Sequence, residues 1–296
     1  MTAPRPRENR AGLAVATLLV VFAMFTSMDT IAKWLVTAGL PAIQVAFLRY
    51  AVHFVAILVA YLPGSGLSIL RSNAPGIEVL RGVMLFASTV FNFAALVYLP
   101  LTLTTSIFFA APLLLALMSV PILGDPVGPR RLVASGVGFL GVLVITAPWE
   151  ATFHWAMLYS LAALTGASIY FVLTRKIAGV DDNPTAQVFA SGIATLALAP
   201  PAAWVWVQPS GALDWGLALL LGSLGALGHS LLTRAYRWAE ASVLAPLIYV
   251  QILYASALSW IVFAEPPSAR TLLGASIIIG SGLYLWWRER SLKSGS

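Results

Sequence analysis

The segment Pro41–Val45 reads PAIQV and returns as PTAQV over Pro184–Val188. Lys33 precedes the first copy by the same interval as Lys176 precedes the second. A motif that recurs at a constant offset, with a shared lysine before it, is typical of a duplicated unit. The chain is therefore predicted to contain an internal repeat.

A second pair of segments supports this repeat. Leu123–Pro126 reads LGDP, and Phe263–Pro266 reads FAEP at nearly the same offset. Two matches in the same order indicate two homologous halves. We expect one integral membrane domain built from an N-terminal repeat, residues 1–150, and a C-terminal repeat, residues 151–296.

Long stretches without charged residues, such as Gly82–Gly124 and Ala241–Ala264, separate the clusters of charge. A helix needs about 20 apolar residues to span a bilayer, and the uncharged stretches divide into ten such helices. We expect these helices at residues 11–35, 41–62, 76–98, 101–121, 129–148, 153–174, 184–207, 213–236, 241–263 and 269–287.

The basic residues sort by side once these helices are drawn. All of them lie at one side except Lys33 and Arg270, which lie at the other, and Arg49, which lies inside a helix. Arg71 and Arg81 are counted with the loop between the second and third helices, whereas the equivalent loop of the second half carries no basic residue. The positive-inside rule then predicts that both termini are cytoplasmic. Each repeat holds five helices, an odd number, so the second repeat must be inverted. Inverted repeats of this kind are typical of transporters, in which the two halves enclose a site near the middle of the membrane.

Composition agrees with this all-α integral membrane fold. The chain is 59% hydrophobic and only 9% charged, whereas soluble domains carry about 25% charged residues. The net charge of +6 is spread over loops, where it attracts lipid headgroups rather than nucleic acid. The chain has no cysteine, and its three histidines lie far apart, so we expect no metal site, no cofactor and no enzymatic activity.

The segment Arg130–Ile145 (RRLVASGVGFLGVLVI) resembles the EamA family of the drug/metabolite transporter superfamily. Phe47–Tyr50 (FLRY), the LGDP segment and Glu265 in the second half extend the resemblance over nearly the whole chain. Asp125 departs from the glutamate that is usual in the family. The resemblance implies ten helices in two inverted five-helix repeats, cytoplasmic termini and transport of small metabolites, and several similar subgroups export amino acids.

Asp29 and Lys33 share one face of the first expected helix with Thr26 and Thr30. Ionisable residues inside a membrane helix mark functional sites by default. One interpretation is that this face lines the transport pathway. The alternative is that Lys33 caps the periplasmic end of the helix, where its amine reaches interfacial water, and that Asp29 pairs with it one turn away.

Arg49 lies inside the second expected helix, where an arginine costs roughly 2.5–3.5 kcal/mol on insertion scales. It is interpreted either as an anchor for a substrate carboxylate or as a structural residue, which packs against its neighbours or forms an ion pair with Asp29. His53 lies one turn further along the same face. It is either a buried neutral histidine bonded to a hydroxyl or a proton-coupling residue.

Other polar and aromatic side chains are candidates for substrate contact or for hydrogen bonds between helices. They are Ser88, Asn92, Tyr98, Tyr170, His229, Tyr249, Gln251 and Tyr254. The mid-helix prolines Pro112 and Pro246 are candidate hinges. Six glycines are predicted to allow close helix packing, namely Gly222, Gly225, Gly228, Gly274, Gly280 and Gly282.

We therefore expect a secondary transporter that works by alternating access through a central cavity. The resemblance favours an amino-acid exporter in the bacterial inner membrane, with a small-molecule substrate and membrane lipid as partners and a monomeric state. The alternatives are a passive channel or facilitator, and a transporter of another small amphipathic metabolite or drug. The isolated polar residues favour a gated cavity over the continuous polar lining of a channel.

Overall fold

The computed structural model describes residues 11–294 except 112, 115–116, 119–121, 123–128, 148, 151–152, 177–179 and 239–244. Within these residues the chain forms ten α-helices and two short 3-10 segments. The α-helices are α1 (Ala11–Thr37), α2 (Ala42–Ser65), α3 (Pro75–Leu96), α4 (Leu101–Phe108), α6 (Pro129–Thr146), α7 (Met157–Lys176), α8 (Asn183–Trp204), α9 (Ala212–Trp238), α11 (Gln251–Phe263) and α12 (Ala269–Ser294). The 3-10 segments are η1 (Gly66–Leu70) and η2 (Ala245–Val250). The predicted all-α architecture of ten helices is confirmed.

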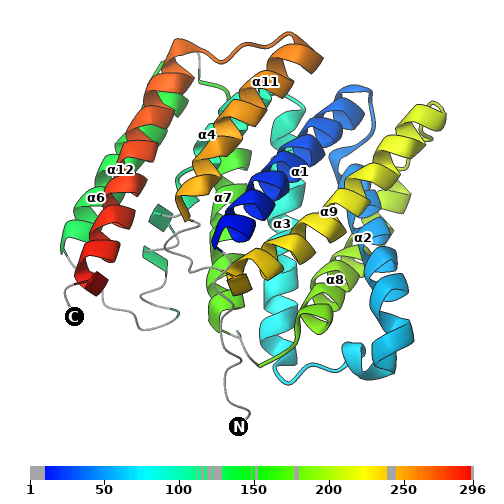
Figure 1. The fold of residues 1–296 in the computed structure, drawn as a ribbon. Coiled ribbons are helices and arrows are strands. Elements are labelled where there is room, and N and C mark those ends of the chain that lie inside the picture. Colours follow the sequence, from blue (N-terminus) through cyan, green and yellow to red (C-terminus); the bar gives the residue numbers. More distant parts are fainter. Residues whose placement is uncertain are drawn as a thin grey trace.

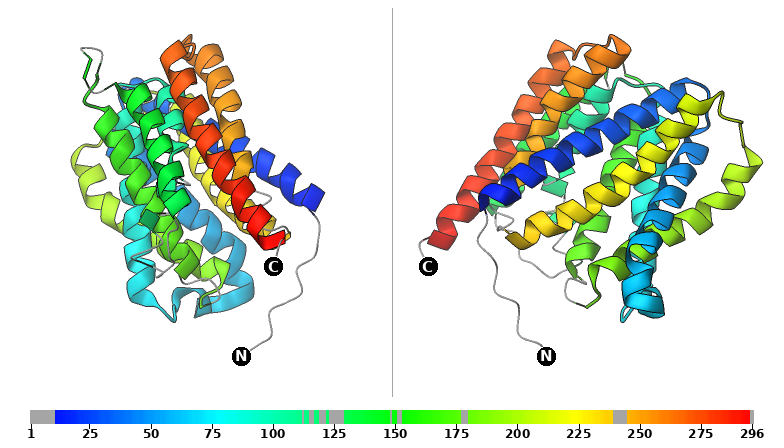
Figure 2. Two further views of the ribbon diagram at one scale, coloured as in Figure 1. Left: turned by 90° about the vertical axis from the view of Figure 1, so that its left-hand side faces the viewer. Right: turned by 45° about the vertical axis from the view of Figure 1, so that its right-hand side comes forward.

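Helix length and composition fit a membrane. Six of the described helices are long and apolar enough to cross a bilayer, and three shorter apolar helices lie in α6, in α12 and across η2 and α11. Successive helices cross the bundle in opposite senses, and the start of α1 and the end of α12 lie at the same end of it (Figures 1 and 2). The side of the membrane on which that end lies stays a prediction.

The helix contacts follow the predicted repeat. α1 packs on α9, and α7, the counterpart of α1, packs on α3, the counterpart of α9. Three further pairs join a helix to its own counterpart: α2 to α8, α4 to α11, and α6 to α12. In addition, α2 packs on α9 and α3 packs on α8. Because α7 is the fifth described α-helix after α1, an odd step, these two helices run in opposite directions (Figure 1). The two repeats are therefore inverted relative to each other and interleaved.

Two helices differ from the expected ranges 101–121 and 241–263. α4 ends at Phe108 and is followed by a turn at Phe109–Ala110, while α11 begins only at Gln251 after the 3-10 segment η2. The sequence has a proline just after this turn and another, Pro246, within η2, and proline has no N–H to continue a helix. Sequence alone indicated the prolines but not the turn at Phe109–Ala110 or the 3-10 segment, and helix is described again at Ala111, Leu113 and Leu114.

Close helix packing centres on some of the predicted glycines. A Cβ on Gly274 would lie 2.7 Å from the carbonyl oxygen of Gly141, and a Cβ on Gly141 would lie 2.9 Å from the carbonyl oxygen of Gly274. α6 and α12 therefore cross at backbone contact. Around Gly280, by contrast, there is open space, so its predicted packing role is wrong.

Two clamps hold the α2–α8 side of the bundle, one at each end. The Gln44 side chain exchanges two hydrogen bonds with the backbone of Val207, of 2.7 and 2.8 Å. At the other end, the backbone N–H of Asn73 donates to Asp181 Oδ1 at 2.8 Å. Each clamp joins the first repeat to the second.

Candidate functional site

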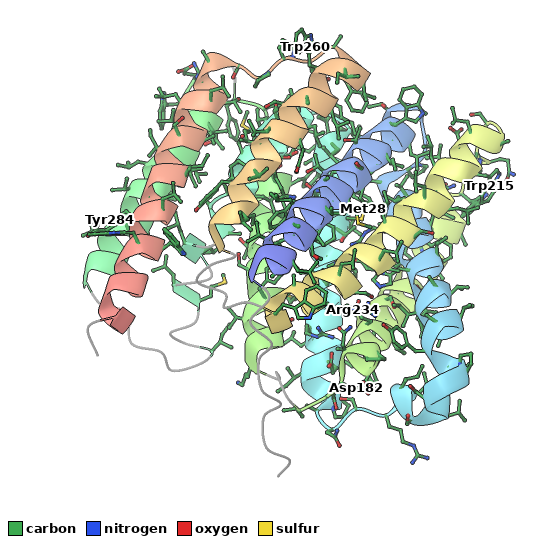
Figure 3. The ribbon with its side chains drawn as sticks, viewed as in Figure 1. Met28, Asp182, Trp215, Arg234, Trp260 and Tyr284 are labelled. Atoms are coloured by element: carbon green, nitrogen blue, oxygen red, sulfur yellow. The ribbon has the colours of Figure 1, made fainter. Side chains whose placement is uncertain are left out.

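A cluster of buried polar side chains lies where α1, α2, α3 and α9 meet. We call Asp29, Arg49, His53, Asn92 and His229 the central cluster. Met28, which contacts it, lies midway between Trp260 near one end of the bundle and Asp182 near the other (Figure 3). The cluster therefore sits at the middle of the membrane-spanning helices, where inverted-repeat transporters bind substrate.

Arg49 is 3% exposed. Its Nε donates to Met28 Sδ at 3.3 Å, and its Nη1 donates to Thr89 Oγ1 at 3.3 Å. The guanidinium also lies over the ring of Tyr50, 4.4 Å from the centroid. Among the described residues, no carboxylate forms an ion pair with it, so the alternative of an Asp29–Arg49 pair is wrong. A buried cation without an anion is costly, because the low-dielectric surroundings do not replace its hydration.

Asp29 is half-buried and takes a different partner. Its Oδ1 accepts from Asn92 Nδ2 at 3.1 Å. Met28 and Asp29 are neighbours on α1, and Thr89 and Asn92 lie one turn apart on α3, so the bonds of Arg49 and Asp29 lie side by side. Asp29 likewise does not pair with Lys33, which is the other alternative for this residue.

His53 lies against His229 from α9. The two imidazole centroids are 5.9 Å apart and the rings are nearly parallel, while Phe25 of α1 packs on the other side of His229. Both ring nitrogens of His53 are buried without a hydrogen-bond partner among the described residues. The predicted bond from His53 to a hydroxyl is therefore absent there.

Lys33 lies apart from the central cluster, at the end of the bundle where α11 ends. It is 3% exposed and forms an ion pair with Glu265. Its Nζ also donates to the Leu99 carbonyl at 3.2 Å and lies 4.7 Å from the centroid of the Phe263 ring. One lysine of the first repeat thus holds the second repeat at this end, and its predicted contact with interfacial water is wrong.

A further ion pair between the repeats lies at the same end. Arg270 at the start of α12 bonds Glu150 with an N–O distance of 2.6 Å. Together with the Lys33–Glu265 pair, it closes this end by contacts between the two repeats.

Sequence reasoning missed three members of the surroundings. Thr89 and Tyr50 bond each other at 2.7 Å beside Arg49. Arg81, interpreted as a loop charge, is 3% exposed within α3, where it pairs with Glu78 at 2.6 Å and donates to the Ala186 carbonyl. The i, i+3 spacing of Glu78 and Arg81 was the available signal.

The remaining candidates are spread over the bundle. Ser88 donates to the Ala163 carbonyl at 2.7 Å and so joins α3 to α7. Tyr98 is 52% exposed and stacks on His154, whereas Tyr170 is buried beneath Arg81. Tyr249 lies in η2, and its ring packs edge-on against the ring of Phe109, which follows α4.

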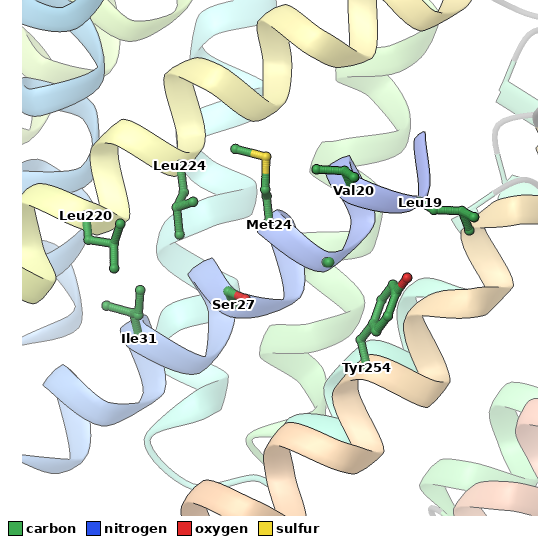
Figure 4. Close-up of a pocket in the computed structure, with 9 residues that line it drawn as sticks. Leu19, Val20, Met24, Ser27, Ile31, Leu220, Leu224 and Tyr254 are labelled. Carbon is green, nitrogen blue, oxygen red and sulfur yellow. The ribbon is translucent and has the colours of Figure 1, made fainter. Parts of the chain in front are cut away.

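Gln251 opens α11, Pro246 lies in η2, and Pro112 is outside the described residues. Tyr254 borders an open apolar groove of about 430 Å³ between α1, α9 and α11, which Ser27, Met24 and Leu224 also line (Figure 4). Its lining is apolar apart from Ser27 and Tyr254, so it offers little to fix a polar solute.

Asp181 is a charged group outside the spanning helices. Burial raises the pKa of Asp181, but hydrogen bonds from Asn73 and Ser72 outweigh burial and hold the pKa below its usual value of 3.8. This carboxylate stays ionised at neutral pH and holds the loop before α3 to the loop before α8. Among the described residues, no three His, Cys, Asp or Glu side chains gather where they could bind a metal.

Comparisons with known proteins agree with the duplicated fold. The model of the EamA-like transporter family matches residues 12–147 and again 154–287. The chain is similar to the S-adenosylmethionine uptake transporter of Rickettsia felis, with 28% identity over 90% of each chain. It is also similar to the riboflavin transporter of Vibrio cholerae, with 29% identity over 95% of each chain.

Two more likenesses complete the comparison. The pseudopaline exporter CntI of Pseudomonas aeruginosa is 28% identical over 90% of this chain and 94% of its own length. One solved crystal structure superposes with a TM-score of 0.65 over 96% of this chain and 99% of its own, at 19% identity, which shows a likeness of fold alone.

Proposed function

Because this chain belongs to the EamA-like transporter family, we propose that it transports small metabolites that carry a carboxylate group. We propose further that it exports amino acids. It is a multi-pass membrane protein and a secondary transporter of small metabolites, not an enzyme. The residues of the central cluster indicate which chemical group of the substrate is bound. The proposal rests on Arg49, a buried cation without an anionic partner among the described residues.

A carboxylate is the group that Arg49 lacks. The guanidinium has five N–H donors in a fixed fork that matches a carboxylate in two parallel hydrogen bonds. Nε and Nη1 bond a thioether and a hydroxyl, both neutral and weak partners for a cation. A substrate carboxylate would supply the missing charge at the middle of the membrane.

Asp29 supplies the complementary charge. Asn92 bonds one oxygen of its carboxylate, and the other oxygen accepts no hydrogen bond from the described residues. A substrate ammonium group would bind there, one helix position from the Met28 contact of Arg49. An acid and a base side by side suit the zwitterion of an amino acid, and S-adenosylmethionine, named in a relative, contains such a group.

The inverted repeats support transport by alternating access. The central cluster lies between helices of both repeats, and the Lys33–Glu265 and Arg270–Glu150 pairs close one end. Opening that end and closing the other would expose the same site to the opposite side of the membrane. An open pore would need both ends accessible at once.

The test is transport in proteoliposomes that contain the purified protein. Radiolabelled amino acids and S-adenosylmethionine should exchange across the membrane, and Arg49→Gln should reduce the exchange roughly 10- to 100-fold. Riboflavin, which has no carboxylate, serves as the discriminating solute. Transport of riboflavin without transport of any carboxylate solute would disprove the proposal. Loading from inside and from outside in turn would test the direction.

A further inference from the structure

His53 is the buried titratable group for which the proposed carboxylate site gives no role. It is 1% exposed, and neither ring nitrogen has a hydrogen-bond partner among the described residues. A neutral imidazole carries one N–H donor and one nitrogen that can accept a proton or a hydrogen bond. A buried polar group without partners calls for an explanation, and one explanation is a function.

The groups that face His53 come from three helices. Arg49 lies one turn away on α2, His229 stacks on the ring from α9, and Gln187 approaches from α8 without reaching hydrogen-bond geometry. His229 and Arg49 are the titratable or charged members of this set. Neither offers a negative charge that would stabilise a protonated His53.

The side of the ring toward α9 leaves room for one carbon atom beside Gly225. A Cβ placed on Gly225 would lie 3.6 Å from His53 Nδ1, 3.7 Å from Met28 Sδ and 3.9 Å from Arg49 Nε. All three distances are ordinary van der Waals contacts. A single atom beside Gly225 would therefore touch the histidine and the arginine together.

Electrostatic interactions then couple protonation of His53 to the binding of an anion. With Arg49 one turn away and no carboxylate between it and His53, a second positive charge on His53 is repelled. A carboxylate beside Gly225 reverses this effect, because it attracts both cations in a medium of low dielectric. Each of the two species thus favours the binding of the other.

We propose that His53 takes up one proton when a substrate carboxylate binds between it and Arg49, so that proton and substrate cross the membrane together. The inference rests on the proposed carboxylate site. The proton comes from the solution that the open site faces, binds Nδ1 of His53, and leaves to the opposite solution with the substrate. No bond other than this N–H forms or breaks.

The coupling has a consequence for direction. If a proton leaves with each substrate, an inward proton gradient opposes export. The protein would then release its substrate only when the cytoplasmic concentration is high enough to overcome that gradient.

Calorimetry can count the proton. L-methionine and S-adenosylmethionine would each be titrated into the detergent-purified protein at about pH 7.5, in buffers of different ionisation enthalpy. The ordinary pKa of histidine is about 6.5, so His53 begins largely unprotonated. The wild type should take up about one proton for each molecule bound, and His53→Gln should bind with an uptake near zero. His154→Gln is the comparison at a histidine outside the central cluster, where it stacks on Tyr98, and should keep an uptake near one.

Gly225→Ala provides a variant that keeps both His53 and Arg49. The added methyl group fits without a clash but occupies the shared space, so binding of both solutes should fall at least tenfold while the thermal unfolding temperature stays near that of the wild type. Binding to the wild type without proton uptake would overturn the proton role and leave the carboxylate site standing. Binding of neither solute would overturn the proposed function, and with it this inference.

Discussion

The helix pairs α1–α2 and α7–α8 occupy equivalent places in the two repeats, yet they differ in chemistry. The offset that relates Lys33 to Lys176 also relates Arg49 to Gly192 and His53 to Leu196. Leu196 is 76% exposed, whereas His53 is 1% exposed. The duplication thus preserves the scaffold, while most polar side chains of the central cluster come from the first repeat and only His229 comes from the second.

The shared lysines reveal a second difference. Lys33 is buried in an ion pair, whereas Lys176 at the end of α7 is exposed. Equivalent positions in an inverted repeat lie at opposite ends of the bundle. The two ends are therefore in different states, with the Lys33 end closed by contacts between the repeats.

The largest effect is expected where the repeats differ most. Arg49→Gln should reduce transport roughly 10- to 100-fold, because hydrogen bonds to a charged group contribute about 1.5–3 kcal/mol each. Lys176→Gln removes a basic residue from the second repeat and should leave substrate affinity nearly unchanged. Equal losses of affinity in both variants, measured by ligand binding, would show that the chemistry is not confined to the first repeat.

The contact between α9 and α2 gives the next effect. A Cβ on Gly222 would lie 2.4 Å from Val52 Cβ and 2.7 Å from the Arg49 carbonyl oxygen. Gly222→Ala should therefore destabilise the protein by about 1–3 kcal/mol. The matched control is Gly225→Ala, one turn along α9 and free of clashes. Thermal unfolding in detergent would compare them, and similar unfolding temperatures would refute the close contact.

Removing the charge of Lys33 should alter transport, because Lys33 pairs with Glu265 at the closed end of the bundle. Lys33→Met removes the ion pair and the bond to the Leu99 carbonyl, at a cost of about 1 kcal/mol, because the unpaired Glu265 is partly exposed and can be hydrated. Flux should change more than stability, since the closed state loses a contact between the repeats. Exchange of the two charges in Lys33→Glu with Glu265→Lys should restore much of the flux. No recovery in the exchanged protein would argue against a role for the pair itself.

The smallest effect concerns the Asp181 clamp. Its pKa is held below 3.8, so the clamp stabilises the fold above the usual aspartate pKa and loses that contribution as the pH falls below about 3.8. Asp181→Asn should lower stability by less than about 1 kcal/mol at neutral pH, because the site is largely exposed. The variant and the wild type should converge in unfolding temperature at low pH. A difference that persists in acid would contradict the ionised clamp.

The sequence predicted the features that depend on local pattern. The order of charges and the length of the apolar stretches predicted the number of helices, and the PAIQV repeat predicted the two halves. Both signals can be read directly from neighbouring residues in the sequence. Arg49 was identified as exceptional for the same reason. Its partners were not identified, since Met28, Thr89 and Tyr50 carry no charge. Helix packing brings them to Arg49, and that packing cannot be read from local sequence pattern.

Long-range pairing explains the remaining errors. Lys33 was predicted to reach interfacial water or to pair with Asp29, one helical turn away. Its partner in the structure is Glu265, which lies in the other repeat. Arg81 was assigned to a loop, although Glu78 one turn away allows it to be buried. Local spacing identifies pairs within one helix and does not identify pairs between helices.

The crossing of α6 and α12 at Gly141 and Gly274 has a consequence for variation among related proteins. Each backbone carbonyl occupies the place where the other glycine would need its Cβ. A larger residue at either position pushes against the other, so neither site can change alone without separating the helices. Each position should therefore remain glycine in relatives that keep this close crossing, whatever residue stands opposite, and a relative that has lost either glycine should hold the two helices further apart.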